Sequence, residues 1–170
     1  LIEATLRRCV EAAQATLLGL GFFFDGPRAG IRIAPQAIAR LKDQLRMLTR
    51  RRWSVSMDYR IGRLNRLITG WVAYFRLAQR VSVLGKLDRW LRRRLRQIRW
   101  KEWKTTAAKR HNLRVRGISE SNARKWAGSS KGYWRIAGSK VLPVSLPSSY
   151  WNRLGLNTLS QTWQRLNRTA

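Results

Sequence analysis

Apolar residues recur every three or four positions along three long segments, which predicts three amphipathic helices. The first segment begins at Pro35, a residue suited to the first helical position, and ends at the run Arg50-Arg51-Arg52. The second covers roughly 57–77 and the third about 82–104. Stripes of this width are typical of helices that bury one face, so we expect the three helices to share a core.

Shorter elements are expected before these helices. Residues 2–18 have a helical pattern. Phe22 to Phe24, a turn through Asp25-Gly26-Pro27, and Ile31 to Ile33 then predict a short β-hairpin. The predicted fold is therefore mainly α, with a three-helix bundle, a smaller helical C-terminal region and a short N-terminal β-hairpin.

After residue 104, glycine and polar residues interrupt the helical pattern of apolar positions. Lys109-Arg110-His111 is typical of a basic loop, and Ser119 is placed to cap a short helix through Ala127 that Gly128 would end. Two further short helices are expected at 148–154, closed by Gly155, and at 158–167.

The net charge of the chain limits the classes of partner that it is expected to bind. The 170 residues contain 36 Lys and Arg against 8 Asp and Glu, a formal net charge of +28. Such an excess of one sign favours a polyanionic partner. With 44% hydrophobic residues and nine Trp the chain can also bury a core, unlike a disordered basic tail. A membrane surface would attract the same cations, but we rank it last because the apolar helix faces are needed for the core.

The segment 82–104 has two faces of different chemistry. Leu84, Leu87, Leu91, Leu95 and Ile98 fall on one stripe at 100° per residue. The opposite side gathers Arg89, Arg93, Arg96 and Lys104, with Trp100 among them. An ordinary solvated face mixes charges of both signs, whereas this helix has only Asp88 and Glu102 to balance nine basic residues. We expect these cations to contact the phosphates of a nucleic acid.

Two further groups complete the expected RNA-binding residues. Arg50, Arg51, Arg52, Lys109 and Arg110 would extend the phosphate contacts. Lys131, Tyr133, Trp134 and Arg135 lie in a glycine-flexed segment, where bases of unpaired or bulged RNA could stack on the rings. The alternative for Trp134 is that it anchors the core.

Catalytic chemistry has few candidates in this sequence. Cys9 and His111 are the only residues of their types, which leaves no disulfide framework and no cysteine-based or histidine-based metal site. No two of the eight acids lie within one helical turn of each other, as a two-metal centre would favour. We therefore expect no catalytic residue, metal, cofactor or small-molecule substrate. No apolar run approaches a membrane span and no signal peptide is visible, so we expect a reducing, cytoplasmic setting.

Several motifs follow one another in an order that suggests a family. They are Ile31-Arg32-Ile33-Ala34-Pro35, Leu64-Asn65-Arg66-Leu67 leading into Gly70-Trp71-Val72-Ala73-Tyr74-Phe75, Leu87-Asp88-Arg89-Trp90-Leu91-Arg92-Arg93-Arg94-Leu95-Arg96, Gly132-Tyr133-Trp134-Arg135, and Tyr150-Trp151 with Gly155-Leu156. From about residue 30 to 166 the chain resembles the C-terminal part of bacterial group II intron reverse transcriptase/maturases, the maturase-specific or X region.

The resemblance implies three parts and a function. Residues 1–34 would be a remnant of the polymerase palm edge, 35–104 a helical thumb, and 105–170 the C-terminal part of the X region. Such proteins bind their own intron RNA and help it adopt its splicing-active form. The chain would do this in a bacterial cytoplasm, with DNA or an RNA–DNA duplex as alternative partners.

The family's catalytic blocks are missing from the chain. It lacks the Tyr-x-Asp-Asp block and fingers of the polymerase and the cysteine pairs of the endonuclease. We therefore expect a chain that is not an enzyme by itself. The first residue is Leu1, not Met, so it would be part of a longer protein or a truncated one. The alternatives are the thumb of an active RNA-directed DNA polymerase whose catalytic half is encoded upstream, and a decayed remnant without a present role.

Overall fold

The computed structural model describes residues 16–25, 28–79 and 81–168. Most of the helix expected over 2–18 lies outside these residues. Its end is wrong, because Thr16–Leu17 form the strand β1 instead. Leu18 and Gly19 then turn the chain with φ of 53° and 82°, and positive φ at both central positions suits the two-residue turn of a hairpin.

The strands form one antiparallel sheet at the N-terminal end of the described chain. Strand β2 spans Leu20–Asp25 and β3 spans Arg28–Ile33, with Phe22 opposite Ile31. The expected hairpin is confirmed, and β1 adds a short third strand on the other side of β2. The sheet is tied to the helices by Gln79, whose backbone amide donates to the Ile31 carbonyl at 2.8 Å.

Three long helices follow, as the apolar stripes predicted. Helix α2 spans Pro35–Leu48, α3 spans Met57–Tyr74 and α4 spans Ser82–Glu102. Helix α3 ends three residues before the expected 77, in a turn in which the Ala78 amide bonds to the Phe75 carbonyl. The stripes meet in a core that includes the fully buried Leu41, Leu45, Leu64, Ile68, Leu84, Leu87, Leu91 and Leu95.

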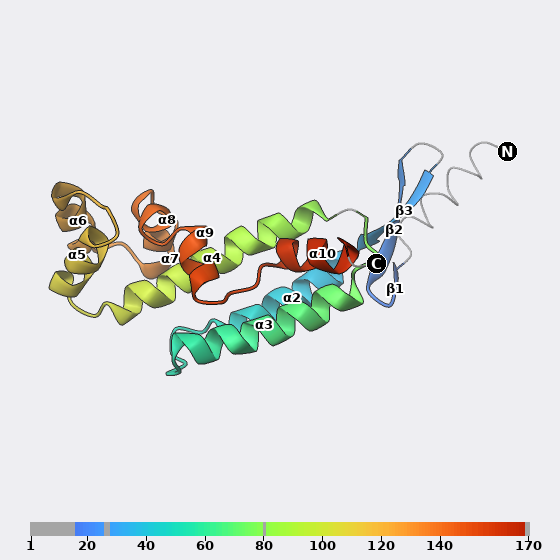
Figure 1. The fold of residues 1–170 in the computed structure, drawn as a ribbon, viewed down its shortest axis with the longest axis horizontal. Helices are drawn as coiled ribbons and strands as arrows, with labels where there is room; N and C mark the ends of the chain where they lie inside the picture. The colour runs from blue at the N-terminus through green and yellow to red at the C-terminus, as the bar shows by residue number, and fades with distance from the viewer. Residues whose placement is uncertain (1–15, 26–27, 80, 169–170) are drawn as a thin grey trace.

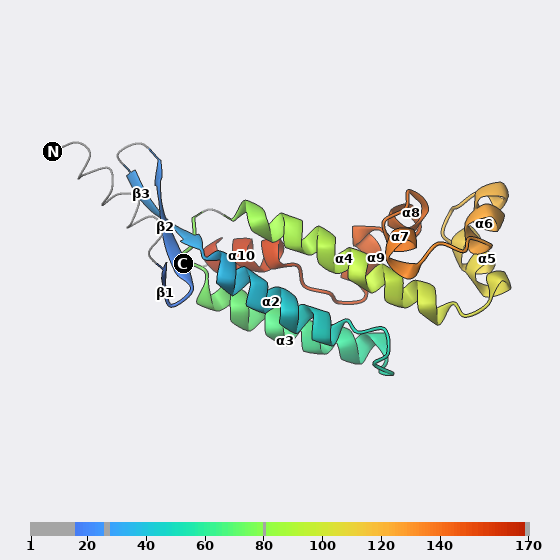
Figure 2. The ribbon, with the colours of Figure 1, turned by 180° about the vertical axis from the view of Figure 1, so that it is seen from behind.

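A fourth helix completes the bundle. Helix α10, Leu159–Arg168, comes from the far end of the sequence and packs against α3 and α4 (Figures 1 and 2). The side chain of Asn65 on α3 holds the approach to α10, because it donates to the Gly155 carbonyl at 2.7 Å and accepts from the Asn157 amide at 2.8 Å. The expected division at residue 104 stays a prediction, but α10 lies with the bundle helices.

The remaining helices gather around the far end of α4. They are α5 Thr106–Arg114, α6 Glu120–Ala127, α7 Tyr133–Ala137, α8 Val141–Ser145 and α9 Ser148–Arg153. Because α4 reaches from the bundle to this group, the molecule is elongated (Figure 1). No helix in the described part of the chain is long and apolar enough to cross a membrane.

Two expectations about this region need correction. The basic loop at 109–111 is wrong, because these residues lie inside α5, whose start is capped by Thr105 accepting from the Ala108 amide at 3.1 Å. Ser119 and Gly128 flank α6 as expected, but the Ser119 hydroxyl accepts from the Asn122 side chain and caps no backbone amide. Helices α9 and α10 were expected, whereas α7 and α8 were not.

Candidate nucleic-acid interface

A pocket lined mainly by cations lies between the turn after α2 and the middle of α4. We call it the basic pocket, and its lining residues are Thr49, Arg50, Arg51, Arg52, Arg94, Gln97 and Lys101. Five of these side chains are positively charged, and no carboxylate of the described residues is among them. A concave surface that carries one sign of charge concentrates the opposite charge from solution.

A buried arginine holds the turn that carries three of these cations. Arg60 on α3 is only 1% exposed. Its guanidinium donates to the Leu48 carbonyl and, at 2.8 Å, to the Trp53 carbonyl. Burial lowers the pKa of Arg60, an effect that the Glu102 carboxylate partly offsets. Arg60 therefore fixes the two ends of the segment from which Arg50, Arg51 and Arg52 project.

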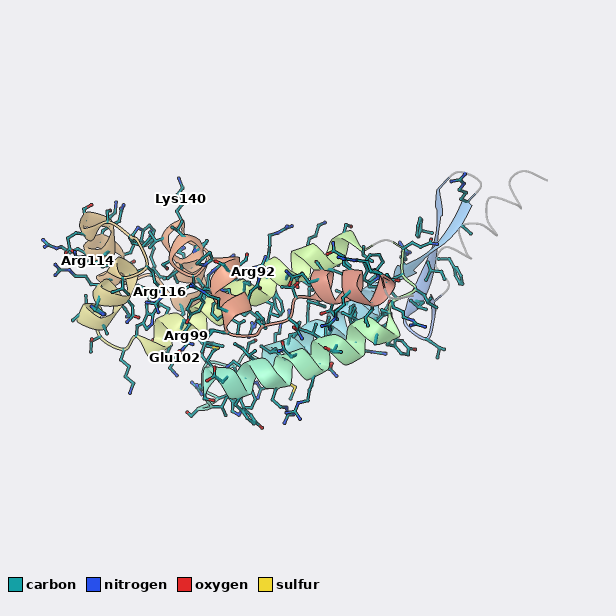
Figure 3. The ribbon with its side chains drawn as sticks, in the orientation of Figure 1. Arg92, Arg99, Glu102, Arg114, Arg116 and Lys140 are labelled. Atoms are coloured by element: carbon teal, nitrogen blue, oxygen red, sulfur yellow. The ribbon has the colours of Figure 1, made fainter. Side chains whose placement is uncertain are left out.

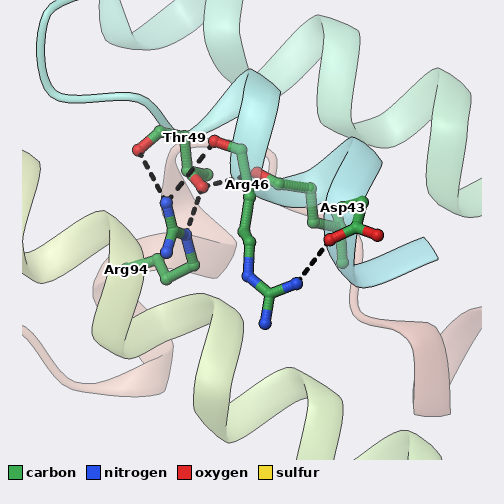
Figure 4. A network of polar contacts seen from close by, with 5 residues as sticks. Asp43, Arg46, Thr49 and Arg94 are labelled. Atoms are coloured by element: carbon green, nitrogen blue, oxygen red, sulfur yellow. Dashed lines mark hydrogen bonds and ion pairs between the residues drawn. The ribbon is translucent and has the colours of Figure 1, made fainter. Parts of the chain in front are cut away.

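Arg94 joins α4 to this turn (Figure 4). Its Nε donates to the Thr49 hydroxyl at 2.6 Å, and a terminal nitrogen lies 3.4 Å from the carbonyls of Arg46 and Thr49. Burial lowers the pKa of Arg94, and the nearby cations Arg46 and Arg51 lower it further. Among the described residues, Arg46 alone has an acidic partner in this network, namely Asp43 at 2.5 Å. The pocket therefore concentrates positive charge that no carboxylate of the described residues in its lining neutralises.

Two partly exposed aromatic residues lie at the start of α7, and the first of them contacts an arginine of the pocket. We call Tyr133 and Trp134 the aromatic pair; they are 37% and 41% exposed. The Arg51 guanidinium lies 4.6 Å from the Tyr133 ring centre, and that of Arg93 lies 4.0 Å from the Trp134 ring centre. Arg93 also donates to the Trp134 carbonyl at 3.0 Å. Arginine–aromatic contacts thus join α7 to the pocket.

The structure brings some of the expected RNA-binding residues together and separates others. Arg50, Arg51, Arg52, Arg93, Tyr133 and Trp134 meet around the basic pocket and the aromatic pair. Arg89, Lys104 and Arg135 are exposed. Lys131 lies 5.1 Å from the Trp126 ring centre. Lys109 and Arg110 sit on α5 at the far end of the molecule (Figure 1).

The expected exposure of Trp100 is wrong. It is 3% exposed and packs edge-on against Trp103, with ring centres 5.8 Å apart. The amine of Lys109 lies 5.1 Å from its ring centre. A spacing of 100° per residue predicted that Trp100 lies opposite the leucine stripe and faces solvent. At this end of α4, however, neighbouring helices cover both faces of the helix. Trp100 cannot serve as a stacking surface while it is buried there.

Arg96 is also engaged inside the protein. Its Nε donates to the Leu146 carbonyl at 3.2 Å. Burial lowers its pKa to about 10, with a further contribution from the cation Arg92. Arg93 and Arg96 each donate a hydrogen bond to a backbone carbonyl of the C-terminal region. These two arginines of the predicted cationic face therefore attach the C-terminal helices to α4. Phosphate contacts by the two residues stay a prediction.

Arg110 has an acidic partner. Glu120 at the start of α6 pairs with Arg110, with Arg114 at 2.9 Å and with Arg124 at 3.7 Å. One carboxylate thus links three guanidinium groups across α5 and α6. Figure 3 shows that Arg114 and Arg116 lie at this end of the molecule, whereas Arg92 and Arg99 lie along α4.

Four of the described acids have structural partners. Asp88 bonds to the start of α10, Glu102 pairs with Arg99 at 2.7 Å, and Asp43 and Glu120 pair with arginines as above. Within the described ranges no cluster of three or more His, Cys, Asp or Glu side chains could hold a metal ion.

Sequence reasoning missed Arg94, Gln97 and Lys101. All three lie on α4 but outside the set assigned to the exposed face. Arg94 flanks the leucine stripe on the side that faces α2, where it reaches the Thr49 hydroxyl. The run of arginines at 92–94 was a signal that more than one side of α4 is basic, but only the position of α2 shows which side forms a pocket.

The fold and this surface define a strongly basic, helical domain. Residues 38–117 match the family model described as Group II intron, maturase-specific domain. The match supports the resemblance of this segment to the maturase-specific region of group II intron reverse transcriptase/maturases, a family whose function is related to group II intron splicing. The matched segment includes every residue of the basic pocket, whereas the aromatic pair lies beyond it. No curated protein matches the chain.

Proposed function

We propose that this chain binds group II intron RNA and assists its folding and splicing, with the RNA itself performing the chemistry. The observation that carries the proposal is the basic pocket, whose five cations face no carboxylate among the described residues. Phosphates neutralise such a cluster and release counterions on binding. The maturase-specific family of residues 38–117 supports intron RNA as the polyanion.

The pocket is suited to position an RNA strand. Arg94 and Lys101 are held by hydrogen bonds to Thr49 and to the Arg51 carbonyl, the latter at 2.9 Å. Arg50 and Arg52 are exposed at its edge. Contacts of this kind to the backbone fix the register of a nucleic acid without reading its sequence. A protein that holds one folded conformation of the RNA shifts the RNA population towards it.

We also propose that the chain is non-catalytic by itself. The partners of Asp43, Asp88, Glu102 and Glu120 support this, since each of these carboxylates pairs with a cation or a helix start. Primer extension on an RNA template with this chain alone should give no product. Robust DNA synthesis would instead favour the alternative, a working polymerase thumb.

The test of RNA binding is the affinity for a folded group II intron between 50 and 500 mM salt. The logarithm of the association constant should fall linearly with the logarithm of salt concentration. Arg50→Gln with Arg52→Gln should make the slope shallower by about 0.7–0.9 for each phosphate that the variant no longer neutralises. Arg40→Gln, an exposed arginine on α2 outside the pocket, is the matched control. An affinity that does not change with salt would refute the proposal.

A further inference from the structure

The basic pocket and the aromatic pair share an arginine. Arg51 belongs to both, because it lines the pocket and its guanidinium lies 4.6 Å from the Tyr133 ring centre. Arg93 and Arg94 are consecutive on α4, yet the first contacts Trp134 and the second lines the pocket. Tyr133 therefore lies beside the pocket through Arg51, and Trp134 follows it at the start of α7.

Each ring of the pair has an arginine neighbour and exposed surface. Trp134 is held at its backbone by the Arg93 guanidinium, while 41% of the residue remains exposed. Tyr133 is 37% exposed at the first position of α7. Large aromatic side chains with this much free surface, next to unneutralised cations, match the two halves of a nucleotide: a flat base and a negatively charged phosphate.

We propose that this surface is a binding site for an unpaired RNA nucleotide, with its phosphate in the basic pocket and its base stacked on Tyr133 or Trp134. The proposal rests on the proposed function and specifies which RNA feature the chain selects. In a regular duplex both faces of a base are already covered by its neighbours, so only a bulged or single-stranded base can stack on a protein ring.

The charges around the pocket support a phosphate there. Arg46, Arg51 and Arg94 stand close enough that the first two lower the pKa of Arg94. Asp43, bonded to Arg46 at the edge of this network, is the one acid that the described residues place in it. A bound phosphate would relieve this repulsion and accept hydrogen bonds from Arg50 and Arg52, which are exposed.

The experiment uses the whole chain and two RNA hairpins of equal length. One carries a single bulged 2-aminopurine and the other has the same base paired with uridine. The bulged hairpin should bind more tightly by about 5- to 150-fold, the value of one base–aromatic stack. Its fluorescence should fall on binding, because a base stacked on an aromatic ring is quenched. The paired hairpin should show no such fall.

Substitutions of the two rings test whether they cause the preference for the bulged hairpin. Tyr133→Leu and Trp134→Leu should together reduce the preference, measured as the ratio of the two affinities, to about 1. Tyr74→Leu is the matched control, since Tyr74 is 55% exposed on α3 and donates to the Leu18 carbonyl, away from the pocket. Circular dichroism checks that each variant is folded, and the quenching in the unmutated chain gives an answer that does not depend on any variant.

The outcomes separate this inference from the proposed function. Equal affinity for the two hairpins, or quenching that persists in the Tyr133→Leu and Trp134→Leu variant, would overturn the nucleotide site while salt-dependent binding of the folded intron still stands. Binding to neither hairpin nor to the folded intron would overturn both.

Discussion

The carboxylate of Asp88 caps α10 through Ser160. It accepts from the Ser160 hydroxyl at 2.7 Å, from the Ser160 amide at 3.1 Å and from the Leu159 amide at 2.8 Å. The first amides of a helix have no partner within the helix, and a negative charge at that end is favourable. A residue on α4 therefore fixes the start of a helix that lies 71 positions later in the sequence.

Replacing Asp88 should release α10 from the bundle. Asp88→Ala leaves two amides at a buried helix start without an acceptor, which should lower the free energy of unfolding by about 2 kcal/mol. Urea unfolding followed by circular dichroism measures the change. Asp43→Ala is the control, because its exposed ion pair should contribute less than about 1 kcal/mol. Equal losses for the two variants would contradict the capping role.

Arg60 should matter for both stability and RNA binding. Arg60→Met removes the donors to the Leu48 and Trp53 carbonyls, so the free energy of unfolding should fall by about 2–3 kcal/mol. The affinity for intron RNA should also fall, since Arg50, Arg51 and Arg52 project from the segment that Arg60 holds. Arg63→Met changes an exposed arginine of the same helix and should alter stability by less than about 0.5 kcal/mol.

The contribution of Arg96 to stability should depend on pH. Burial lowers its pKa to about 10 in the folded protein, so the unfolded chain holds this proton more tightly. The free energy of unfolding contributed by Arg96 should therefore be lowest below pH 10 and rise as pH increases above about 10. The measurement compares the unmutated chain with Arg96→Gln at pH 8 and pH 10.5. The free energy of unfolding of the unmutated chain, relative to that of Arg96→Gln, should be higher at pH 10.5 than at pH 8. An equal difference at the two pH values would refute the lowered pKa.

Local patterns of the sequence predicted the long elements but not how their ends meet. The leucine spacing and Pro35 predicted α2, and the stripe through Leu91 predicted α4, because burial of one helix face requires that periodicity. The return of α10 depends on the contact between Asp88 and Ser160, which no local pattern carries. The basic pocket depends on Arg94 facing α2, and the burial of Trp100 depends on helices that follow it in the chain.

Glu120 should limit RNA binding at the far end of the molecule. It is shared by Arg110, Arg114 and Arg124, so Glu120→Gln frees three guanidinium groups from their carboxylate. Stability should fall by about 1 kcal/mol. Affinity for intron RNA at 50 mM salt should rise, because Arg110 and Arg114 regain full attraction for phosphates. Glu102→Gln, which removes the ion pair with Arg99, should raise the affinity less. An affinity that stays constant or falls in folded Glu120→Gln protein would show that these arginines take no part in RNA binding.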